Sequence, residues 1–240
     1  MKIIVTGKMK DKKIKVGYRM FFASLIKDCL SKSDKEYFEE MYFYEGKKSK
    51  KLKPFTFSVY LEDFKIGSEF IDVNGDVRLI ISSPDMKFNI LVFTALMGLS
   101  SYGDFIKTSV KMQNERKIHE NECIMKTLSP IYIKDKVGNA LRLDDENYNE
   151  VFYYYADLIL KIYRGFGLKE PLEFIPLNMK KVVVKEEING FREVTNKKFI
   201  YFTAYSGTFK LKGDIDDLNL LMDSGLGCRR SSGFGNIDLV

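Results

Sequence analysis

The chain has 240 residues, 45% of them hydrophobic and 30% charged, which is ordinary globular composition with ample apolar material for a core. Its formal net charge of +6 is compatible with a polyanionic partner. Three scattered cysteines, Cys29, Cys123 and Cys228, exclude a disulfide framework and a paired-cysteine zinc site, and they favour a reducing, cytoplasmic location. No signal-peptide pattern is present, and the longest apolar stretch, residues 90–99, is too short to span a bilayer. We therefore expect a cytoplasmic protein with no membrane partner, no metal and no cofactor.

Apolar spacing in the first half of the chain predicts strands and helices in alternation. Period-two alternation indicates strands, and apolar residues three and four apart indicate helices. Ser33 and Glu36 form a capping-box pattern that starts one short helix, because each side chain can accept a backbone amide of the other residue. The expected strands are residues 3–5, 55–60, 76–82 and 105–118. The expected helices are residues 18–30, the short helix after the capping box, and residues 84–99.

The second half repeats this order. The expected strands are residues 124–133, 173–186, 198–212 and a short final strand. The expected helices are residues 147–166 and 214–223, and Asp214 or Asp216 caps the second of them. Each half therefore reads βαββαβ, the ferredoxin-like order, with one extra helix in the first half. We predict an α+β fold of two tandem ferredoxin-like (RRM-like) domains, an N-terminal one at residues 1–122 and a C-terminal one at residues 123–240.

A glycine-rich loop, GLGCRRSSGFG at residues 225–235, lies between the last predicted helix and the last strand. Backbone amides in such a loop can form a nest for phosphate oxygens, and glycine permits the dihedral angles that a nest needs. Arg229 and Arg230 would add charge-assisted contacts. The loop matches neither the P-loop nor the dinucleotide-binding fingerprint. Glycine content alone fits a helix C-cap followed by a bulge equally well.

The spacing G-x-G-x5-G-F-G resembles a loop near the C-terminus of RAMP-superfamily CRISPR-associated proteins. It most resembles that of the repeat-processing endoribonuclease, the sixth Cas family. Residues 126–131, KTLSPI, resemble the strand that opens this family's second domain, and residues 55–58, FTFS, resemble a strand of its first domain. The resemblance covers nearly the whole chain and implies the RAMP architecture of tandem ferredoxin-like domains.

The resemblance also implies an activity. A member of this family binds the repeat RNA of a CRISPR precursor transcript and cleaves it once in each repeat without a metal, which produces mature guide RNAs. The 2′-hydroxyl of the RNA attacks the adjacent phosphate and leaves a 2′,3′-cyclic phosphate and a 5′-hydroxyl. A non-catalytic repeat-RNA-binding protein and a RAMP subunit of an interference complex remain alternatives. A homodimer and association with interference-complex subunits also remain open.

The catalytic residues of the family are matched only in part. Many members use a histidine with a tyrosine and a lysine. Lys27 stands where the family often has the tyrosine, Glu39 or Glu40 stands near the place of the histidine, and Lys53 is retained. The resemblance therefore implies a variant without the catalytic histidine.

A histidine-free site would depend on cations. Lys27, Lys53, Arg229 and Arg230 are the catalytic candidates, because cations can fix the scissile phosphate and stabilise its developing charge. Proton transfer is the step that these cations perform poorly near neutral pH, and the weaker candidates for it are Tyr18, Ser24 and Tyr37. The single histidine, His119, lies far in sequence from these residues, and we expect it to be a surface residue.

The RNA-binding candidates come from two loops. The glycine-rich loop contributes Gly225, Gly227, Arg229, Arg230, Ser231, Gly233 and Gly235. A lysine-rich loop contributes Lys47, Lys48, Lys50 and Lys51. Such lysines are ordinarily solvated, but along an RNA path they would make binding strongly salt-dependent.

Overall fold

The computed structural model describes residues 1–49, 51–114, 116–187, 196 and 198–240, and it divides into two compact units. The first unit contains Met1–Lys53, Val59–Asn114 and Lys185–Ile200. The second unit contains Pro54–Ser58, Glu115–Val184 and Tyr201–Val240. The main division falls after Asn114, whereas the boundary predicted from the sequence follows residue 122.

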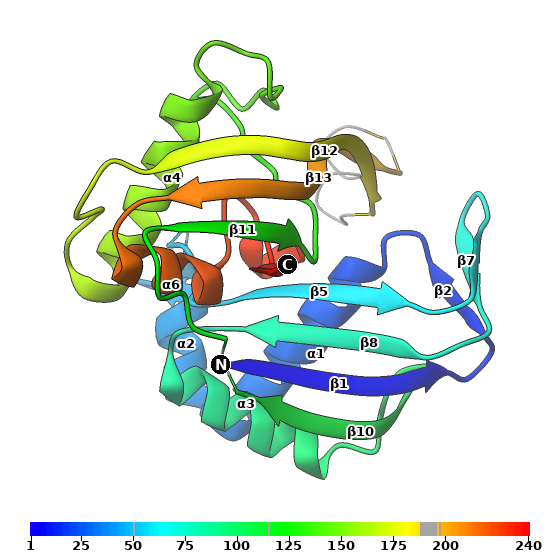
Figure 1. Cartoon of the computed structure of the whole chain (residues 1–240). Coiled ribbons are helices and arrows are strands. Elements are labelled where there is room, and N and C mark those ends of the chain that lie inside the picture. The colour runs from blue at the N-terminus through cyan, green and yellow to red at the C-terminus, as the bar shows by residue number, and fades with distance from the viewer. Residues whose placement is uncertain (50, 115, 188–195, 197) are drawn as a thin grey trace. The chain divides into compact units, whose positions relative to one another are not determined.

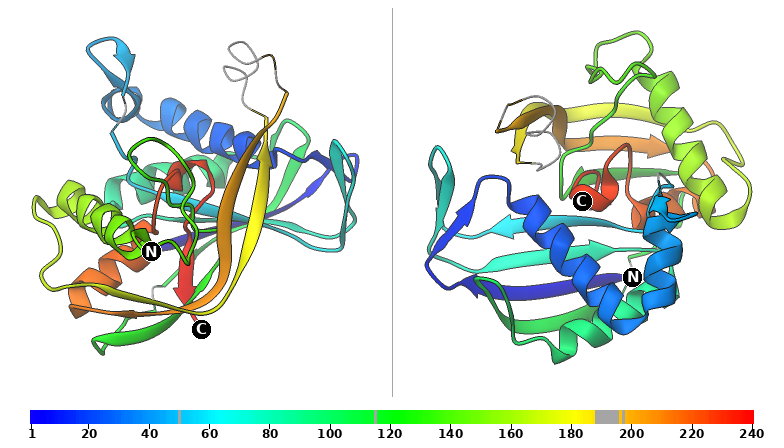
Figure 2. Two further views of the ribbon diagram at one scale, coloured as in Figure 1. Left: turned by 90° about the horizontal axis from the view of Figure 1, so that it is seen from above. Right: turned by 180° about the vertical axis from the view of Figure 1, so that it is seen from behind.

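The first unit is built on a five-stranded sheet with the strand order β5-β8-β1-β10-β9. Its strands are β1 (Lys2–Met9), β5 (Thr56–Leu61), β8 (Val77–Ser82), β9 (Ser101–Tyr102) and β10 (Phe105–Gln113), and the first three residues of β5 are counted with the second unit. Strand β1 pairs antiparallel with both β8 and β10. Helices α1 (Tyr18–Ser33) and α3 (Met86–Gly98) lie on one face of this sheet (Figures 1 and 2). Ile3, Val5 and Phe22 are fully buried, so the core lies between that face and the helices.

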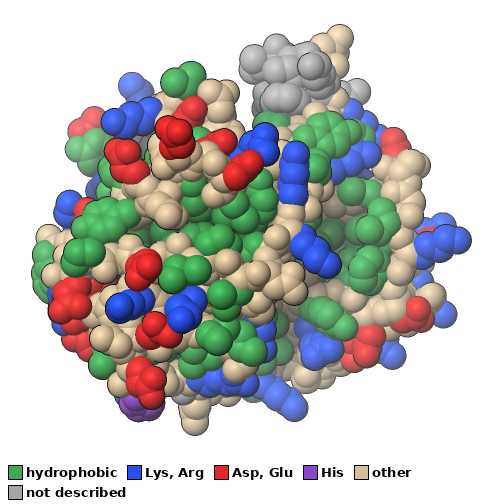
Figure 3. All heavy atoms as spheres, turned by 45° about the horizontal axis from the view of Figure 1, so that its top comes forward, with side chains coloured by type: hydrophobic (Ala, Val, Ile, Leu, Met, Phe, Trp, Pro, Cys, Tyr) green, Lys and Arg blue, Asp and Glu red, His purple; other side chains and the backbone are tan. Residues whose placement is uncertain are grey.

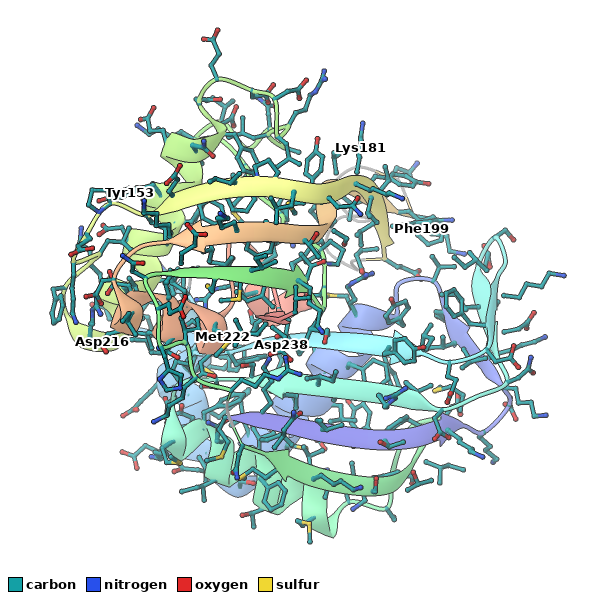
Figure 4. The ribbon with its side chains drawn as sticks, in the orientation of Figure 1. Tyr153, Lys181, Phe199, Asp216, Met222 and Asp238 are labelled. Carbon is teal, nitrogen blue, oxygen red and sulfur yellow. The ribbon has the colours of Figure 1, made fainter. Side chains whose placement is uncertain are left out.

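The second unit has a four-stranded sheet with the order β12-β13-β11-β14. Its strands are β11 (Glu122–Thr127), β12 (Glu173–Glu186), β13 (Ile200–Lys212) and β14 (Ile237–Leu239). Its helices, α4 (Tyr148–Arg164) and α6 (Ile215–Ser224), contact each other, and Figure 4 labels Asp216 and Met222 on α6. In each unit, four strands belong to a βαββαβ series. Numbered along the chain, they lie across the sheet in the order second, third, first, fourth. The predicted α+β fold with a ferredoxin-like order in each half is confirmed.

A short segment of the first half of the chain belongs to the second unit. Thr56 Oγ1 donates a hydrogen bond to the carbonyl oxygen of Phe234 at 2.8 Å, and Asn236 Nδ2 donates to Ser58 Oγ at 3.2 Å. Thr56 is fully buried and Ser58 is 2% exposed, so these bonds lie inside the unit. The FTFS stretch is thus a packing partner of the glycine-rich loop.

Two small β elements were not predicted. A three-stranded sheet has the order β2-β7-β6 and consists of β2 (Lys13–Lys15), β6 (Phe64–Ile66) and β7 (Phe70–Val73). A hairpin joins β3 (Phe43–Tyr44) to β4 (Lys47–Lys48). Both belong to the first unit. These strands are only two to four residues long, so any apolar alternation in them is too short to predict a strand.

The helix caps differ from the expectation at one place. Asp34, not Ser33, is the N-cap of α2 (Lys35–Tyr42), and its carboxylate accepts the backbone amide of Tyr37 at 2.9 Å. The Ser33–Glu36 capping box is therefore wrong, because Ser33 is still the last residue of α1. Asp214 is the cap of α6, which decides between the two expected aspartates.

Two strands are shorter than expected. Strand β10 ends at Gln113. Strand β11 ends at Thr127, because the backbone amides of Leu128 and Ser129 donate hydrogen bonds to the carbonyl oxygen of Asn236 instead of continuing the strand pairing. In the described part of the chain, no helix has both the length and the apolar character needed to cross a membrane.

Candidate functional site

Two of the predicted catalytic lysines lie against one aromatic ring in the first unit. Lys27 projects from α1, and its Nζ is 4.9 Å from the centre of the Tyr42 ring. Lys53 follows the β3–β4 hairpin, and its Nζ is 5.1 Å from the same centre. Attraction between an ammonium group and an aromatic ring favours both positions. The structure thus brings Lys27 and Lys53 together around Tyr42, which was not among the predicted site residues.

Lys53 is fixed more firmly than Lys27. Its Nζ donates hydrogen bonds to the carbonyl oxygens of Met41 at 2.6 Å and Ser49 at 3.2 Å. Burial lowers the pKa of Lys53, and the nearby charges of Lys27 and Lys51 lower it further. Lys27 is exposed. The cluster therefore combines one half-buried cation in a fixed position with one that solvent or a ligand can reach.

Tyr42 acts as a platform in this cluster. It ends α2, and its ring packs at 4.9 Å from that of Phe38. Burial raises the pKa of the Tyr42 hydroxyl above that of an ordinary tyrosine. Tyr42 contacts Lys27, Lys53 and Phe38 through its ring.

The residues considered for proton transfer, Tyr18, Ser24 and Tyr37, make different contacts in the first unit. The Tyr37 hydroxyl donates to Asp85 Oδ2 at 2.7 Å, which ties α2 to the start of α3. The hydroxyls of Ser24 and Tyr102 share a hydrogen bond of 2.7 Å. The Tyr18 ring lies 4.9 Å below the guanidinium of Arg19. Tyr37 and Ser24 therefore use their hydroxyls in contacts between elements of the first unit, whereas the Tyr18 contact is made by its ring.

The two glutamates considered in place of a histidine lie on α2. Glu39 and Glu40 are both exposed, and Glu39 Oε1 is 3.8 Å from Lys35 Nζ. An exposed carboxylate paired with a lysine of its own helix is the ordinary condition of a helix surface.

The β3–β4 hairpin presents aromatic and basic groups beside this cluster. Phe43 is 41% exposed and Tyr44 is 60% exposed. Lys47 is exposed on β4, and Lys51 Nζ is 5.4 Å from the centre of the Tyr44 ring. The Lys48 backbone pairs with Phe43, but its side chain and all of Lys50 lie outside the described residues. Exposed rings beside lysines suit the bases and phosphates of single-stranded RNA.

The glycine-rich loop is packed inside the second unit. Its four glycines are buried and have φ angles of +77°, +73°, +85° and +70°. A Cβ at Gly235 would lie 1.9 Å from the carbonyl oxygen of Leu226, and one at Gly227 would lie 2.6 Å from that of Tyr132. The Leu226 amide donates to the carbonyl oxygen of Gly235 at 2.9 Å. This differs from the expected open nest, because these glycines serve close backbone packing and inward hydrogen bonds.

The two adjacent arginines of the loop have different surroundings. Arg230 is 3% exposed, and its Nη1 donates to the carbonyl oxygen of Ser224 at 2.5 Å. Arg229 is exposed in a left-handed backbone conformation, and its guanidinium lies 4.4 Å from the centre of the Phe202 ring. Ser231 is half-buried. Arg229 is therefore the exposed arginine of the loop, whereas Arg230 is buried and bonded to the end of α6.

The single histidine lies in the other unit from the lysine cluster. His119, purple in Figure 3, is exposed and follows Ile118. The Ile118 amide donates to Asn219 Oδ1, and Asn219 Nδ2 donates to the Ile118 carbonyl oxygen, each at 2.9 Å. His119 belongs to the second unit, whereas Lys27 and Lys53 belong to the first. Within the described ranges, no group of three or more His, Cys, Asp or Glu side chains is placed to hold a metal ion.

Comparison with known proteins finds one family and several similar structures. The family model "CRISPR associated protein Cas6, C-terminal" matches residues 113–239, which is more than half of the chain. The CRISPR-associated endoribonuclease Cas6 1 of Methanocaldococcus jannaschii is 24% identical over 239 residues, which cover 93% of this chain and 86% of that protein.

The solved structures extend the likeness to the whole fold. One named "CRISPR associated protein Cas6" has a TM-score of 0.74 at 22% identity and covers 100% of this chain and 99% of its own. Another, "An RAMP protein binding different RNA substrates", has a TM-score of 0.80 at 17% identity and the same coverage. A Cas6-related protein of Pyrococcus furiosus has a TM-score of 0.80 at 17% identity and covers 100% of this chain and 98% of its own. The predicted RAMP architecture is confirmed.

Proposed function

Because the chain belongs to the CRISPR-associated protein Cas6 family, we propose that it binds CRISPR repeat RNA and cleaves the precursor transcript within each repeat, which yields mature guide RNAs. The M. jannaschii relative is named an endoribonuclease, and one similar structure is described as binding RNA substrates. The observation that carries the cleavage step is the placement of Lys27 and Lys53 around Tyr42.

The proposed reaction uses a nucleophile from the substrate itself. The 2′-oxygen attacks the adjacent phosphorus, the bond from phosphorus to the 5′-oxygen breaks, and the products are a 2′,3′-cyclic phosphate and a 5′-hydroxyl. The proton of the 2′-hydroxyl passes to solvent, and the departing 5′-oxygen takes up a proton. No metal-bound water is required, because the attacking oxygen is already held beside the phosphorus. We therefore propose metal-independent cleavage.

The two lysines would divide the remaining work. Lys27, which is exposed, would contact the non-bridging phosphate oxygens and stabilise their growing charge. Lys53 is held by two carbonyl oxygens, and its lowered pKa moves proton transfer closer to neutral pH. Lys53 is thus the proposed donor of a proton to the 5′-oxygen.

The RNA-binding part of the proposal uses both units. In the first unit, the exposed rings of Phe43 and Tyr44 would stack on bases, and Lys47 and Lys51 would contact phosphates. In the second unit, Arg229 would contact the RNA backbone from the glycine-rich loop. The buried glycines and Arg230 would serve RNA binding indirectly, because they fix the backbone that carries Arg229.

The test is single-turnover cleavage, in EDTA, of a precursor transcript that carries the repeats of the chain's own CRISPR locus. We expect wild-type cleavage, and we expect none when the nucleotide at the cut site is 2′-deoxy. Lys27→Ala and Lys53→Ala should each slow cleavage by roughly a hundredfold or more, because each removes charge from the reacting phosphate. Lys136→Ala is the matched control, since Lys136 is an exposed lysine of the second unit.

The second candidate function is binding of repeat RNA without cleavage. It is favoured by the place of the only histidine, which lies in the second unit, while Glu39 and Glu40 are exposed on α2 of the first. Tight binding of an RNA that stays intact at high protein concentration would establish this function and overturn the enzymatic one. Size-exclusion chromatography of the same samples tests for a homodimer, and co-purification tests for interference-complex subunits.

A further inference from the structure

Two adjoining cavities in the first unit share a wall made of Lys15, Phe70 and Glu187. The larger has a volume of about 350 Å³ and is also lined by Lys13, Tyr18 and Asp104. The smaller has a volume of about 260 Å³ and is also lined by Phe199, which Figure 4 labels just before β13. Tyr18 and Lys27 are nine residues apart on α1, so the larger cavity and the lysine cluster are separated by about 14 Å of helix. The cavities are therefore a separate feature of the first unit.

The shared wall is held in place by specific contacts. Lys15 and Phe70 are paired residues of β2 and β7. Glu186, which is 1% exposed, accepts a hydrogen bond from Arg19 Nη1 at 3.2 Å, and this fixes the chain next to Glu187. Gly17 permits the close approach, since a Cβ there would lie 2.9 Å from the Glu187 amide nitrogen. Glu187 is thus positioned by a buried ion pair and by backbone packing.

The rings and lysines of these cavities suit single-stranded nucleic acid. Phe70 is 46% exposed and faces both cavities. In the smaller cavity, the centre of the Phe199 ring is 3.9 Å from Lys185 Nζ and 5.2 Å from Lys198 Nζ. Lys198 Nζ also donates a hydrogen bond to Glu69 Oε1 in the same lining, which leaves Lys185 as the cation better placed for a phosphate. Stacking on an aromatic ring with a lysine at the phosphate is how proteins commonly hold an unpaired nucleotide.

The carboxylates of the larger cavity narrow the choice of base. Glu187 and Asp104 would repel a phosphate, so the group entering beside them must donate hydrogen bonds. Guanine presents two adjacent donors, N1–H and the 2-amino group, which match the two oxygens of one carboxylate. Lys13 and Lys15 at the same cavity can take the phosphate of that nucleotide.

A cavity of similar size in the second unit lacks this combination. It has a volume of about 340 Å³ and is lined by Glu170, Glu173 and one cation, Lys212. With two carboxylates and a single lysine it offers no comparable phosphate contact. Its lining also contains two carboxylates and two rings, but these rings, Phe152 and Phe174, are buried. The lysine pair and the exposed ring of Phe70 are therefore what distinguish the larger cavity of the first unit.

We propose that the larger cavity binds one guanine of single-stranded RNA, with its base on Phe70 and its Watson–Crick edge on Glu187. The adjacent nucleotide lies in the smaller cavity against Phe199. This inference rests on the proposed RNA-binding function and deepens it by naming a base that the chain reads outside the cleavage site.

The test compares two short uridine RNAs that differ at one central position, guanosine in one and inosine in the other. Inosine lacks the 2-amino group and therefore loses one of the two bonds to Glu187. Fluorescence anisotropy of end-labelled RNA should show about tenfold tighter binding of the guanosine RNA by the wild-type chain. Glu187→Gln should bring the two affinities close together, and the matched variant Glu170→Gln should leave the difference unchanged.

A second variant keeps the proposal testable without Glu187. Phe70→Ala should weaken binding of the guanosine RNA about tenfold, because it removes the stacking surface. Phe64→Ala is its control, since Phe64 is 51% exposed on the same small sheet. Equal affinities of the wild-type chain for the two RNAs, or an unchanged difference in Glu187→Gln, would overturn the inference. Repeat RNA is bound and cut in parallel: normal activity with no base preference refutes this site alone, and no repeat binding at all refutes the proposed function.

Discussion

Arg230 Nη1 donates a hydrogen bond of 2.5 Å to the carbonyl oxygen of Ser224, the last residue of α6, inside the second unit. This bond fastens the start of the glycine-rich loop to its middle. The neighbouring Arg229 points outward over Phe202. We therefore expect the two adjacent arginines of this motif to have separable effects, Arg230 on stability and Arg229 on RNA binding.

We expect Arg230→Ala to lower the free energy of unfolding by about 2–4 kcal/mol, because it leaves the Ser224 carbonyl unsatisfied and opens a buried space. Arg229→Ala should change stability by less than about 0.5 kcal/mol. It should weaken RNA binding and lower the salt slope by about one unit. Urea unfolding and RNA titrations at several salt concentrations measure both effects. A stable Arg230→Ala protein that loses RNA binding would reverse the two assignments.

The glycine spacing makes a second prediction. Gly235→Ala should lower the free energy of unfolding by about 3 kcal/mol or more, because its Cβ would lie 1.9 Å from the Leu226 carbonyl oxygen at a φ of +70°. Gly138→Ala is the matched control, with a φ of +105° and no atom within 4 Å of the added Cβ. Gly138→Ala should cost about 1–2 kcal/mol, the strain of the backbone alone. Urea unfolding measures the free energy of unfolding of both variants. Equal losses would show that close backbone packing is not the reason for a glycine at position 235.

The order of strands and helices could be predicted from the sequence because each long element carries its own apolar period. Helix α4, for example, was expected at residues 147–166 and is found at Tyr148–Arg164. The small sheet containing Phe64–Ile66 was missed because three-residue strands lack such a period. The alternation of Phe64 with Ile66 and of Ile71 with Val73 is the signal that could have revealed it.

The candidate site could be predicted only in part. A motif shows which residues stand close in the chain, but the burial of Arg230 depends on where α6 ends and how the loop returns. Thr56 and Phe234 form a hydrogen bond across 178 residues, and no local pattern encodes such a contact. Tyr42 belongs to the aromatic residues of a short helix, where spacing alone does not separate a core residue from a platform for lysines.

The lowered pKa of Lys53 predicts how stability depends on pH. Between the pKa of folded Lys53 and the ordinary value of 10.5, the unfolded chain binds more protons than the folded chain. The unfavourable burial of the charge is therefore present at lower pH and is relieved as pH rises through the pKa of folded Lys53. Lys53→Met should remove this part of the rise in stability. Lys47→Met, at an exposed lysine of the same hairpin, should retain it.

Urea unfolding of the three proteins at a series of alkaline pH values measures the difference. Comparison of wild type with each variant cancels the contribution of the tyrosines, which ionise in the same range. A Lys53→Met protein whose pH dependence matches that of wild type would show that the charge on Lys53 is not disfavoured by folding. That result would contradict the proposal that Lys53, rather than Lys27, donates the proton.

The last prediction concerns the histidine. His119→Ala should leave the rate of repeat cleavage unchanged, because His119 is exposed in the second unit and the proposed reaction uses Lys27 and Lys53 of the first. If His119 were catalytic, the wild-type pH–rate profile would contain an inflection that the variant lacks. We expect the two pH–rate profiles to superimpose instead. Thermal melting checks that the variant is folded, and Lys27→Ala, measured in the same buffers, shows how a true loss appears. If the cleavage rate of a folded His119→Ala protein fell by several orders of magnitude, His119 would be catalytic and the assignment of the reaction to the lysine cluster would be wrong.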